Sequence, residues 1–324
     1  MHTFQQLVQE FETQITTRNV FPERPNNLYE PCRYLIALKG KRVRPVACLM
    51  AAELFAPIPS CTWDAAIAIE LFHNFTLIHD DIMDKAPLRR GFPTIHAKYG
   101  LTAGILGGDA MSIFAYQSLS NVENNFRKVL NLFNKTAIEV CEGQQMDMDF
   151  ENRTNVTIEE YIEMIQLKTS VLLAASMEIG ALTAFAPEED CKWIYEFGKN
   201  LGIAFQLQDD YLDSFGNTEK IGKQIGGDIL ANKKTYLYLH ALQNANSVQK
   251  EQLAQWLQKE DYVAQDKINT IKEIFTHTHA DQACREAVNH YSQKSFESLM
   301  QLNVPEPKKE PLMLLAKELL NREQ

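Results

Sequence analysis

Two clusters of aspartates interrupt otherwise apolar stretches of this chain. The first lies in HNFTLIHDDIMD, which runs from His73 to Asp84, and the second in FQLQDDYLD, which ends at Asp213. Each has the spacing D-D-x-x-D, which on a helix stacks two carboxylates one turn apart and adds a third beside them. Like charges at this spacing destabilise a helix by roughly a few tenths of a kcal/mol, and burial increases the cost. The fold must therefore supply something that neutralises both clusters.

Glycine and proline are sparse, with 14 Gly and 12 Pro in 324 residues. The long runs between them are rich in Ala, Leu, Ile, Glu, Gln and Lys, which favour helices over a turn-rich β architecture. We therefore predict an all-α fold. Because the chain has no low-complexity segment and no linker, we predict one domain that spans residues 1–324.

Capping residues and prolines predict where several helices begin. Thr157 and Glu160 satisfy the S/T-x-x-E capping box of a helix that is predicted to run without interruption through residues 161–184. Pro45 suits the first turn of a helix, and Pro311 suits the first position of the last one.

Two segments are predicted to be irregular. The proline-containing segment 19–31 is expected to be a connector, with the second helix beginning near Tyr34. The polar, glycine-punctuated segment 216–234 is expected to be a long loop, and such loops in helical proteins are more often functional than decorative.

The charge balance excludes some classes of partner. The formal net charge is −10, and no basic stripe offsets it, which argues against nucleic acid as a partner.

The expected location of the protein follows from the absence of targeting signals. The first residues carry acids and glutamines where a signal peptide would be apolar, and no apolar run reaches membrane-spanning length. Six scattered cysteines are typical of reduced thiols. We expect a cytoplasmic protein without stable membrane insertion.

The aspartates share a helix face with other polar residues. On an ideal helix, His73, Thr76, Asp80 and Asp84 fall within one stripe, whereas Phe75 turns mostly away from it. The second segment repeats this plan. Its stripe consists of Gly202, Gln206, Asp209 and Asp213, with Asp210 about a quarter-turn away.

A divalent cation would turn this repulsion into attraction. Oxygen-only ligands on a helix suit Mg²⁺, which takes one or two carboxylates together with water and substrate phosphate oxygens. A solvated acidic turn would explain one such motif, but two copies in apolar sequence favour the metal. An EF-hand is excluded because its Gly and terminal Glu are missing. Basic residues near turns then mark candidate phosphate ligands: Lys41, Arg44, Arg89, Arg90, Lys168, Lys223, Lys233 and Lys234.

Taken in order, these segments resemble one known family, the trans-isoprenyl diphosphate synthases or polyprenyl synthetases. The resemblance covers about residues 30–240 and is carried by GKRVRP, HDDIMDKAPLRRGFPTIH, GGDA, GQQMD, LKTS, FQLQDDYLD and GKQIGGDI…KKT. The chain departs from the family pattern at two places. Lys39 stands at the first Gly of G-G-K-R, and LANKKT, with Ala231 and Asn232, replaces the commoner x-E-G-K-x-T.

The resemblance implies the isoprenoid synthase fold, a bundle of long, mostly antiparallel helices around a deep central cavity, and a homodimer. It also implies three Mg²⁺ ions per active site, with Mn²⁺ as a substitute. The metal ligands would be Asp80, Asp81, Asp84, Asp209, Asp210 and Asp213. Arg89, Lys168, Thr169, Gln206, Lys223 and Lys233 would serve the allylic diphosphate, and Lys41, Arg44, His73 and Arg90 would bind isopentenyl diphosphate.

The implied reaction is the Mg²⁺-assisted condensation of isopentenyl diphosphate with allylic diphosphates by ionisation, condensation and proton elimination. In the family, an aromatic residue five positions before the first aspartate and a small one at four accompany C20 product. Here these are Phe75 and Thr76, with Phe72 nearby, so geranylgeranyl diphosphate is expected. Farnesyl diphosphate (C15) synthesis is the first alternative, and a non-catalytic subunit of a heteromeric prenyl synthase is the second.

A terpene cyclase would share one aspartate motif, but it would not need GKRVRP for a second diphosphate. A metal phosphohydrolase could use His73, His79 and Asp80, but it would leave the second motif unexplained.

Overall fold

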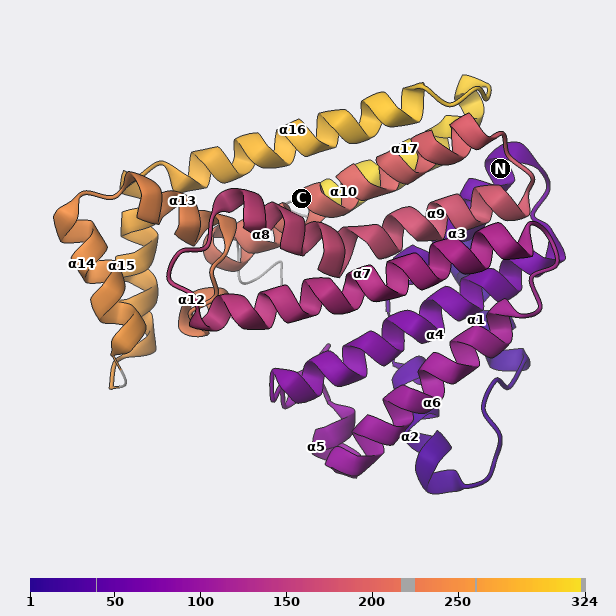
Figure 1. The fold of residues 1–324 in the computed structure, drawn as a ribbon, viewed down its shortest axis with the longest axis horizontal. Coiled ribbons are helices and arrows are strands. Elements are labelled where there is room, and N and C mark those ends of the chain that lie inside the picture. Colours follow the sequence, from indigo (N-terminus) through magenta and orange to yellow (C-terminus); the bar gives the residue numbers. More distant parts are fainter. Residues whose placement is uncertain (39, 217–224, 260, 322–324) are drawn as a thin grey trace. The chain divides into compact units, whose positions relative to one another are not determined.

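The computed structural model describes residues 1–38, 40–216, 225–259 and 261–321. The described residues are helical apart from loops and one two-stranded hairpin, so the prediction of an all-α fold is confirmed (Figure 1). Contacts group the chain into two compact units, which are described separately below. The assignment of one domain stays a prediction.

The first unit comprises residues 1–133, 175–194 and 303–312. Its long helix α4 contacts α3 and α6, and α6 lies beside it in Figure 1. Residues 65–72 of α4 are all buried, so this helix forms part of the core on every side. The elements wholly within this unit are α1 (Phe4–Thr17), α2 (Asn26–Ala37), α3 (Val43–Phe55), α4 (Ser60–Met83), β1 (Leu88–Arg89), β2 (Phe92–Pro93), α5 (Ile95–Tyr99) and α6 (Leu101–Leu119).

The second unit comprises residues 134–174, 195–302 and 313–324, of which the last three are not described. An apolar cluster that includes Leu207, Leu237 and Phe275 forms its core. The elements wholly within it are α8 (Ile158–Ile165), the π-helical turn η1 (Gln166–Ser170), α12 (Gly227–Leu230), α13 (Tyr236–Asn244), α14 (Ser247–Gln258), α15 (Ala264–His277) and α16 (Ala280–Met300). Four helices have residues in both units: α7 (Phe126–Asn152), α9 (Val171–Thr183), α10 (Glu188–Phe215) and α17 (Glu306–Leu320).

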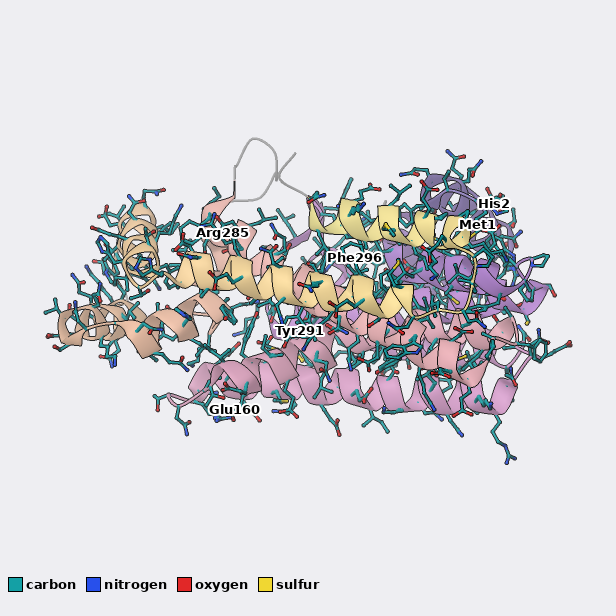
Figure 2. The ribbon with its side chains drawn as sticks, turned by 90° about the horizontal axis from the view of Figure 1, so that it is seen from above. Met1, His2, Glu160, Arg285, Tyr291 and Phe296 are labelled. Carbon is teal, nitrogen blue, oxygen red and sulfur yellow. The ribbon has the colours of Figure 1, made fainter. Side chains whose placement is uncertain are left out.

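Helix α16 packs along α10 inside the second unit. The Ser295 hydroxyl donates to the Phe197 carbonyl at 3.0 Å, and the Arg285 guanidinium lies 5.6 Å from the Tyr211 ring centroid. Figure 2 shows Arg285 and Tyr291 along α16. Helix α10 carries the second aspartate motif, so this packing fixes the helix on which those carboxylates lie.

Some predicted boundaries are confirmed. The Thr157–Glu160 capping box is present at the start of α8, with both reciprocal hydrogen bonds formed. Pro45 lies in the first turn of α3, as predicted.

Other boundaries were wrong. Helix α2 begins at Asn26, inside the expected connector, and α17 begins at Glu306 rather than at Pro311. Pro31 and Pro311 each occupy the sixth position of their helix, where proline removes one intrahelical hydrogen bond. Packing compensates for this loss, because Cys32 and Leu35 of α2 and Leu312 of α17 are buried. The expected loop 216–234 contains the short helix α12.

One helical stretch, Ile158–Thr183, is long and apolar enough to cross a membrane by length and composition. In its apolar window 72% of the residues are buried inside the protein, which is the pattern of a core helix. The cytoplasmic location stays a prediction.

Candidate active site

The first aspartate motif lies at the C-terminal end of α4. Asp80 and Asp81 are in its last turn, and Asp84 caps it by donating its N–H to the Asp80 carbonyl at 2.8 Å. Arg89 of β1 reaches back to this motif. Its Nε lies 2.8 and 2.9 Å from the two Asp81 carboxylate oxygens, and its Nη2 lies 3.3 Å from Asp80 Oδ2. A predicted phosphate ligand thus lies beside two predicted metal ligands.

Asp81 differs from Asp80 in its surroundings. It is only 3% exposed, and burial raises the pKa of its carboxyl, while the Arg89 guanidinium opposes that shift. Both of its oxygens accept from the single Nε–H of Arg89, and Nη2 of the same guanidinium lies 2.8 Å from Oδ1. Asp81 therefore holds Arg89 in place at the edge of the motif.

A basic cluster adjoins the first motif in the same unit. Arg44 Nη1 lies 3.3 Å from His73 Nε2, and because guanidinium only donates, the imidazole nitrogen accepts. Burial and the charges of Arg44 and Arg90 hold the pKa of His73 well below its ordinary value, so this imidazole is neutral with its proton on Nδ1. The Arg90 guanidinium lies against Gly40, where an added Cβ would come within 2.5 Å of Nη1. Lys41 follows directly in sequence.

Arg44 is buried with one hydrogen-bond donor unused. Burial lowers the pKa of its guanidinium to about 10, and its Nε has no hydrogen-bond partner among the described residues. An orphaned buried donor is costly, so a site that presents one is suited to an anionic ligand.

The turn that carries Lys41 and Arg44 is fixed by a residue that the sequence did not single out. Arg42, in the left-handed conformation with φ 49°, is 4% exposed and pairs with Glu70 of α4 and Glu12 of α1 at 2.5 and 2.7 Å. Asn74 donates to the Glu70 carboxylate at 2.9 Å. This buried network ties the basic turn to α4 close to His73. Its signal in the sequence was the extra arginine within GKRVRP.

The predicted chain-length residues lie on different sides of α4. Thr76 shares the stripe of His73 and donates to its carbonyl at 2.8 Å. The Phe75 ring instead contacts the rings of Phe72 and His79, at centroid distances of 5.5 and 4.9 Å. The Nε2 of His79 lies 3.2 Å from the Ile105 carbonyl of α6. This placement of Phe75 agrees with the helical wheel, which turns the residue away from the aspartates.

The second aspartate motif lies near the end of α10, in the second unit. Asp210 accepts hydrogen bonds from the Tyr161 hydroxyl and from Gln206 Nε2, the latter at 3.1 Å. Burial, reinforced by the negative charge of Asp228, raises the pKa of Asp210 to about 8. Thr169 in turn donates to Gln206 Oε1 at 3.3 Å. The predicted residues Thr169, Gln206 and Asp210 therefore form one hydrogen-bonded chain, and Tyr161 was missed.

Asp213 holds the short helix α12. Its Oδ2 accepts the Asp228 N–H at 3.0 Å, and its carbonyl accepts the Gly226 N–H at 2.7 Å. Of the three carboxylates in this motif, Asp210 and Asp213 thus both have protein donors. Asp209, which precedes both along the helix, is partly exposed.

The π-helical turn η1 presents Lys168 and Thr169. Lys168 Nζ lies 2.5 Å from Asp147 Oδ2 of α7. Two glycines admit this widened turn. A Cβ on Gly143 would lie 2.3 Å from the Lys168 backbone nitrogen, and one on Gly202 would lie 2.7 Å from Ser170 Cα. Such π turns are frequent at functional sites, and the sequence had predicted an uninterrupted helix here.

The neighbouring residues Lys233 and Lys234 make different contacts. Lys234 Nζ donates to the carbonyls of Phe150 and Glu151 in the last turn of α7, where a cation also complements the helix dipole. Lys233 precedes it and donates its backbone N–H to Asp228. The predicted ligand Lys223 and the departure at Lys39 lie outside the described residues.

The carboxylates of the first motif fit a metal ion only in part. Within the described part of the chain, no group of three or more His, Cys, Asp or Glu is placed to hold a metal ion by itself. Asp80 and Asp84 lie one turn apart and offer only oxygen ligands, so they fit an ion that completes its coordination shell with water and substrate phosphate.

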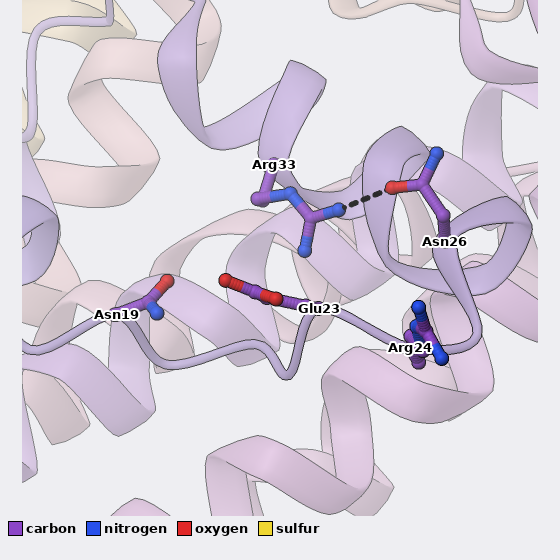
Figure 3. Close-up of a pocket in the computed structure, with 5 residues that line it drawn as sticks. All are labelled: Asn19, Glu23, Arg24, Asn26 and Arg33. Carbon is purple, nitrogen blue, oxygen red and sulfur yellow. Dashed lines mark hydrogen bonds between the residues drawn. The ribbon is translucent and has the colours of Figure 1, made fainter.

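A surface pocket elsewhere in the first unit contains none of the predicted site residues (Figure 3). It is lined by Asn19, Glu23, Arg24, Asn26 and Arg33.

Comparisons with known proteins agree with these observations. The chain is 45% identical over 223 residues to a geranylgeranyl diphosphate synthase of Methanosarcina mazei, covering 68% of this chain and 69% of the relative. A crystal structure of a geranylgeranyl pyrophosphate synthase matches with a TM-score of 0.94 at 41% identity over 100% of both chains. A polyprenyl synthase from Caulobacter crescentus CB15, complexed with calcium and isoprenyl diphosphate, matches with a TM-score of 0.88 at 28% identity over 99% and 98% of the chains. The predicted isoprenoid synthase fold class is thereby confirmed.

A family model described as Polyprenyl synthetase matches residues 25–275. The match spans well over half of the chain and includes both aspartate motifs, the basic turn and the π-helical turn. The chain therefore belongs to the polyprenyl synthetase family of prenyltransferases.

Proposed function

We propose that this enzyme condenses isopentenyl diphosphate with allylic diphosphates and releases geranylgeranyl diphosphate. The observation that carries the proposal is the joint presence, in one unit, of the Asp80–Asp81–Arg89 group and the separate Arg44–His73–Arg90 cluster. One group combines carboxylates with a cation and suits a metal-bound diphosphate. The other is basic throughout and suits a diphosphate without metal.

Isopentenyl diphosphate is assigned to Lys41, Arg44, His73 and Arg90. The unpartnered Nε of Arg44 supports this role, because it leaves one buried N–H for a phosphate oxygen. Neutral His73 adds no charge, but it accepts a hydrogen bond from Arg44 and so fixes the guanidinium plane. Arg42 is a positioning residue for this group.

Magnesium is assigned to the aspartates, with three ions per site and Mn²⁺ as a substitute. Asp80, Asp84 and Asp209 are the primary ligands. Asp81, Asp210 and Asp213 contribute directly or through water, while their protein donors orient them. When bound, Mg²⁺ stabilises the negative charge that develops on the leaving diphosphate.

The allylic diphosphate is assigned to Arg89, Lys168, Lys223 and Lys233, with Thr169 and Gln206 in support. The positive charges of the arginine and the three lysines favour breakage of the allylic C–O bond, whose electron pair leaves with the diphosphate. The allylic cation then bonds to the double bond of isopentenyl diphosphate. Proton loss to the departing diphosphate completes the reaction. Apolar walls around the growing chain exclude the water that would quench the cation.

The chain length is assigned to α4. Phe75 is assigned to the floor of the product pocket, with Phe72 beside it and Thr76 one turn before Asp80, and this sets C20. The assignment requires the pocket to extend to the side of α4 on which the Phe75 ring contacts Phe72 and His79. Replacing Phe75 with Ala should lengthen the product, as measured by chromatography of the dephosphorylated alcohols. An unchanged product would remove Phe75 from the floor and leave that role to residues on the Thr76 face.

The exposed face of α6 supports a homodimer. Leu101, Ile105, Leu106, Ile113 and Tyr116 are 40–67% exposed and fall within an arc of about 140° on the helix. The exposed Thr102 and Asp109 lie within the same arc, so the face is mainly apolar with two polar positions. An exposed apolar face of this kind supports an interaction surface. A second copy of the chain is the proposed occupant, and the dimer is placed in the cytoplasm.

The decisive experiment is an elongation assay. The protein is incubated with Mg²⁺, isopentenyl diphosphate and a C5, C10 or C15 allylic diphosphate, and the product length is determined. C20 product supports the proposal, and C15 product would favour the farnesyl alternative. No elongation with any primer would refute the catalytic assignment and favour the non-catalytic subunit.

Alanine variants test whether the aspartates act as metal ligands. Asp80→Ala and Asp209→Ala should keep normal helical content by circular dichroism and lower turnover by about 10²-fold or more. Asp64→Ala is the matched control, because Asp64 lies in the first turns of the same helix as Asp80 and pairs only with Arg18 among the described residues. A near-normal rate in either motif variant would contradict the metal assignment.

A further inference from the structure

The turn that carries Lys233 departs from the family pattern at the position where glycine is common. Asn232 occupies it with φ 56°, a left-handed conformation that Asn tolerates better than most residues but less readily than glycine. The Asn232 N–H donates to the Ile229 carbonyl at 3.2 Å, and the Lys233 N–H donates to the Asp228 carbonyl at 2.9 Å. This pair of bonds is the Schellman motif that ends α12, with Asn232 at the left-handed position.

A buried lysine contacts this asparagine. Lys267 of α15 is 0% exposed, and its Nζ donates to Asn232 Oδ1 at 2.6 Å. The same ammonium lies 4.8 Å from the centroid of the Tyr262 ring. Over the residues that the structure describes, it has no carboxylate partner within 4.0 Å. A buried ammonium is costly unless it is well bonded, so this contact is a specific feature of the chain.

The contact acts on a segment that is fixed on its other sides. Asp213 bonds the first N–H groups of α12, Ile268 of α15 packs against Gly226, and Lys234 bonds the last carbonyls of α7. The side chain of the left-handed residue Asn232 is thus bonded by Lys267, and the segments before and after it are held by α12 and by Lys234. Lys233, between Asn232 and Lys234, is the side chain whose direction the turn decides.

We infer that Lys267 is a positioning residue for the allylic diphosphate. By bonding Asn232 Oδ1, it stabilises the left-handed turn where glycine is absent and so presents Lys233 to the substrate. This inference rests on the proposed function. If the turn spends part of its time in other conformations, the apparent affinity for the allylic substrate falls by the fraction of competent turn.

The test is a cycle of four proteins: the wild type, Lys267→Met, Asn232→Gly and the double variant. Lys267→Met leaves Asn232 Oδ1 without its donor, and should raise the KM for the allylic diphosphate about tenfold with a smaller change in kcat. Asn232→Gly should keep an allylic KM close to the wild type, since glycine adopts the turn unaided, although its Tm should fall because the buried Lys267 ammonium loses its acceptor. The double variant should regain the allylic KM of Asn232→Gly although it still lacks Lys267.

Thermal unfolding separates this role from a purely structural one. The Tm should fall in both proteins that carry Lys267→Met, because glycine at position 232 does not restore the packing of the buried lysine. Lys250→Met, on the exposed face of α14, is the matched control and should change neither KM nor Tm. A double variant as defective in KM as Lys267→Met alone would overturn the inference, and so would Lys267→Met with a normal KM and a lowered Tm.

Hydrogen exchange tests the turn independently of catalysis. In Lys267→Met, the amides of Asn232 and Lys233 should exchange about tenfold faster than in the wild type, and the double variant should restore protection. If the wild type itself does not elongate, the proposed function fails, while the exchange result still reports on the Lys267–Asn232 contact. Unchanged exchange in Lys267→Met would overturn the inference even in an active enzyme.

Discussion

At the scale of single residues, the site depends on side chains that touch no substrate in the proposal. Arg42 ties the basic turn to α4, Tyr161 bonds Asp210, and Lys267 bonds Asn232. Each is buried and reaches an element distant in the sequence. Their effects should therefore appear in stability or in substrate affinity rather than as loss of a reacting group.

Removing Glu70 should strongly destabilise the fold. Glu70 is 3% exposed and partners the buried Arg42 guanidinium, so Glu70→Ala leaves a buried charge with one partner fewer. The expected loss is about 3 kcal/mol in the free energy of unfolding, measured by urea denaturation. Glu12→Ala is the control, because this second partner is 40% exposed, and it should lose less than about 1 kcal/mol. Equal losses would contradict the dominance of the Glu70 contact.

His73 should make the fold sensitive to acid. Its folded pKa lies below the ordinary value of 6.5, so as pH falls below 6.5 the unfolded chain takes up a proton that the folded chain does not. Stability from this group is complete above pH 6.5 and is lost on acidification, by up to about 1.4 kcal/mol per pH unit. Urea denaturation at pH 7.5 and 5.5 should show a smaller difference for His73→Gln than for the wild type. An identical difference would refute neutral His73.

At the scale of elements, the sequence located the helices but not their local geometry. The stretch 157–184 has continuous helical spacing and a capping box, so one regular helix was predicted. The structure instead inserts the π-helical turn η1 between α8 and α9. Periodicity could not reveal it, because the turn is stabilised by the approach of α7 and α10 at two glycines far away in the chain.

A side chain at Gly202, where α10 approaches η1, should distort the site. Gly202→Ala would place a Cβ 2.7 Å from Ser170 Cα, which is backbone and moves only with η1. We expect a loss of about 1–3 kcal/mol in stability, together with reduced turnover, since Lys168 and Thr169 lie in the displaced turn. Gly107→Ala in α6 is the control, because its Cβ would meet Cys32 Sγ at an ordinary 3.6 Å. A wild-type Tm and rate for Gly202→Ala would refute this dependence.

At the scale of the whole molecule, each unit gathers its own part of the proposed chemistry. The first holds one aspartate motif with Arg89 and the Arg44–His73–Arg90 cluster, and the second holds the other motif with Lys168, Thr169 and Gln206. The elongation assay tests whether both sets act in one reaction.

Association can be tested on the exposed face of α6. Ile113 is 67% exposed on this face, so Ile113→Glu should shift the protein toward monomer in light scattering coupled to size-exclusion chromatography. Val248→Glu on α14 is the control, with a similar exposed fraction of 66%, and should leave the mass unchanged. A wild-type mass for Ile113→Glu would exclude this residue from the interface.

The sequence by itself determined the helical class, the two carboxylate motifs and the family, because helical periodicity and short motifs are local properties of the chain. It also predicted the stripe that carries His73, Thr76 and Asp80, since residues one turn apart share a face whatever the helix packs against. Its errors at Asn26 and Pro311 came from treating proline as a helix boundary where burial outweighs one lost hydrogen bond.

Only the tertiary structure decided which of these side chains are held by others. Asp210 meets Tyr161, 49 residues away, and Asn232 meets Lys267, 35 residues away. Neither pairing has a local signature, because hydrogen bonds between distant elements depend on how those elements pack. For the same reason, the family resemblance places six aspartates in one ligand set, but it does not reveal the distant donors that the folded chain supplies, such as the Tyr161 hydroxyl on Asp210 and the Asp228 N–H on Asp213.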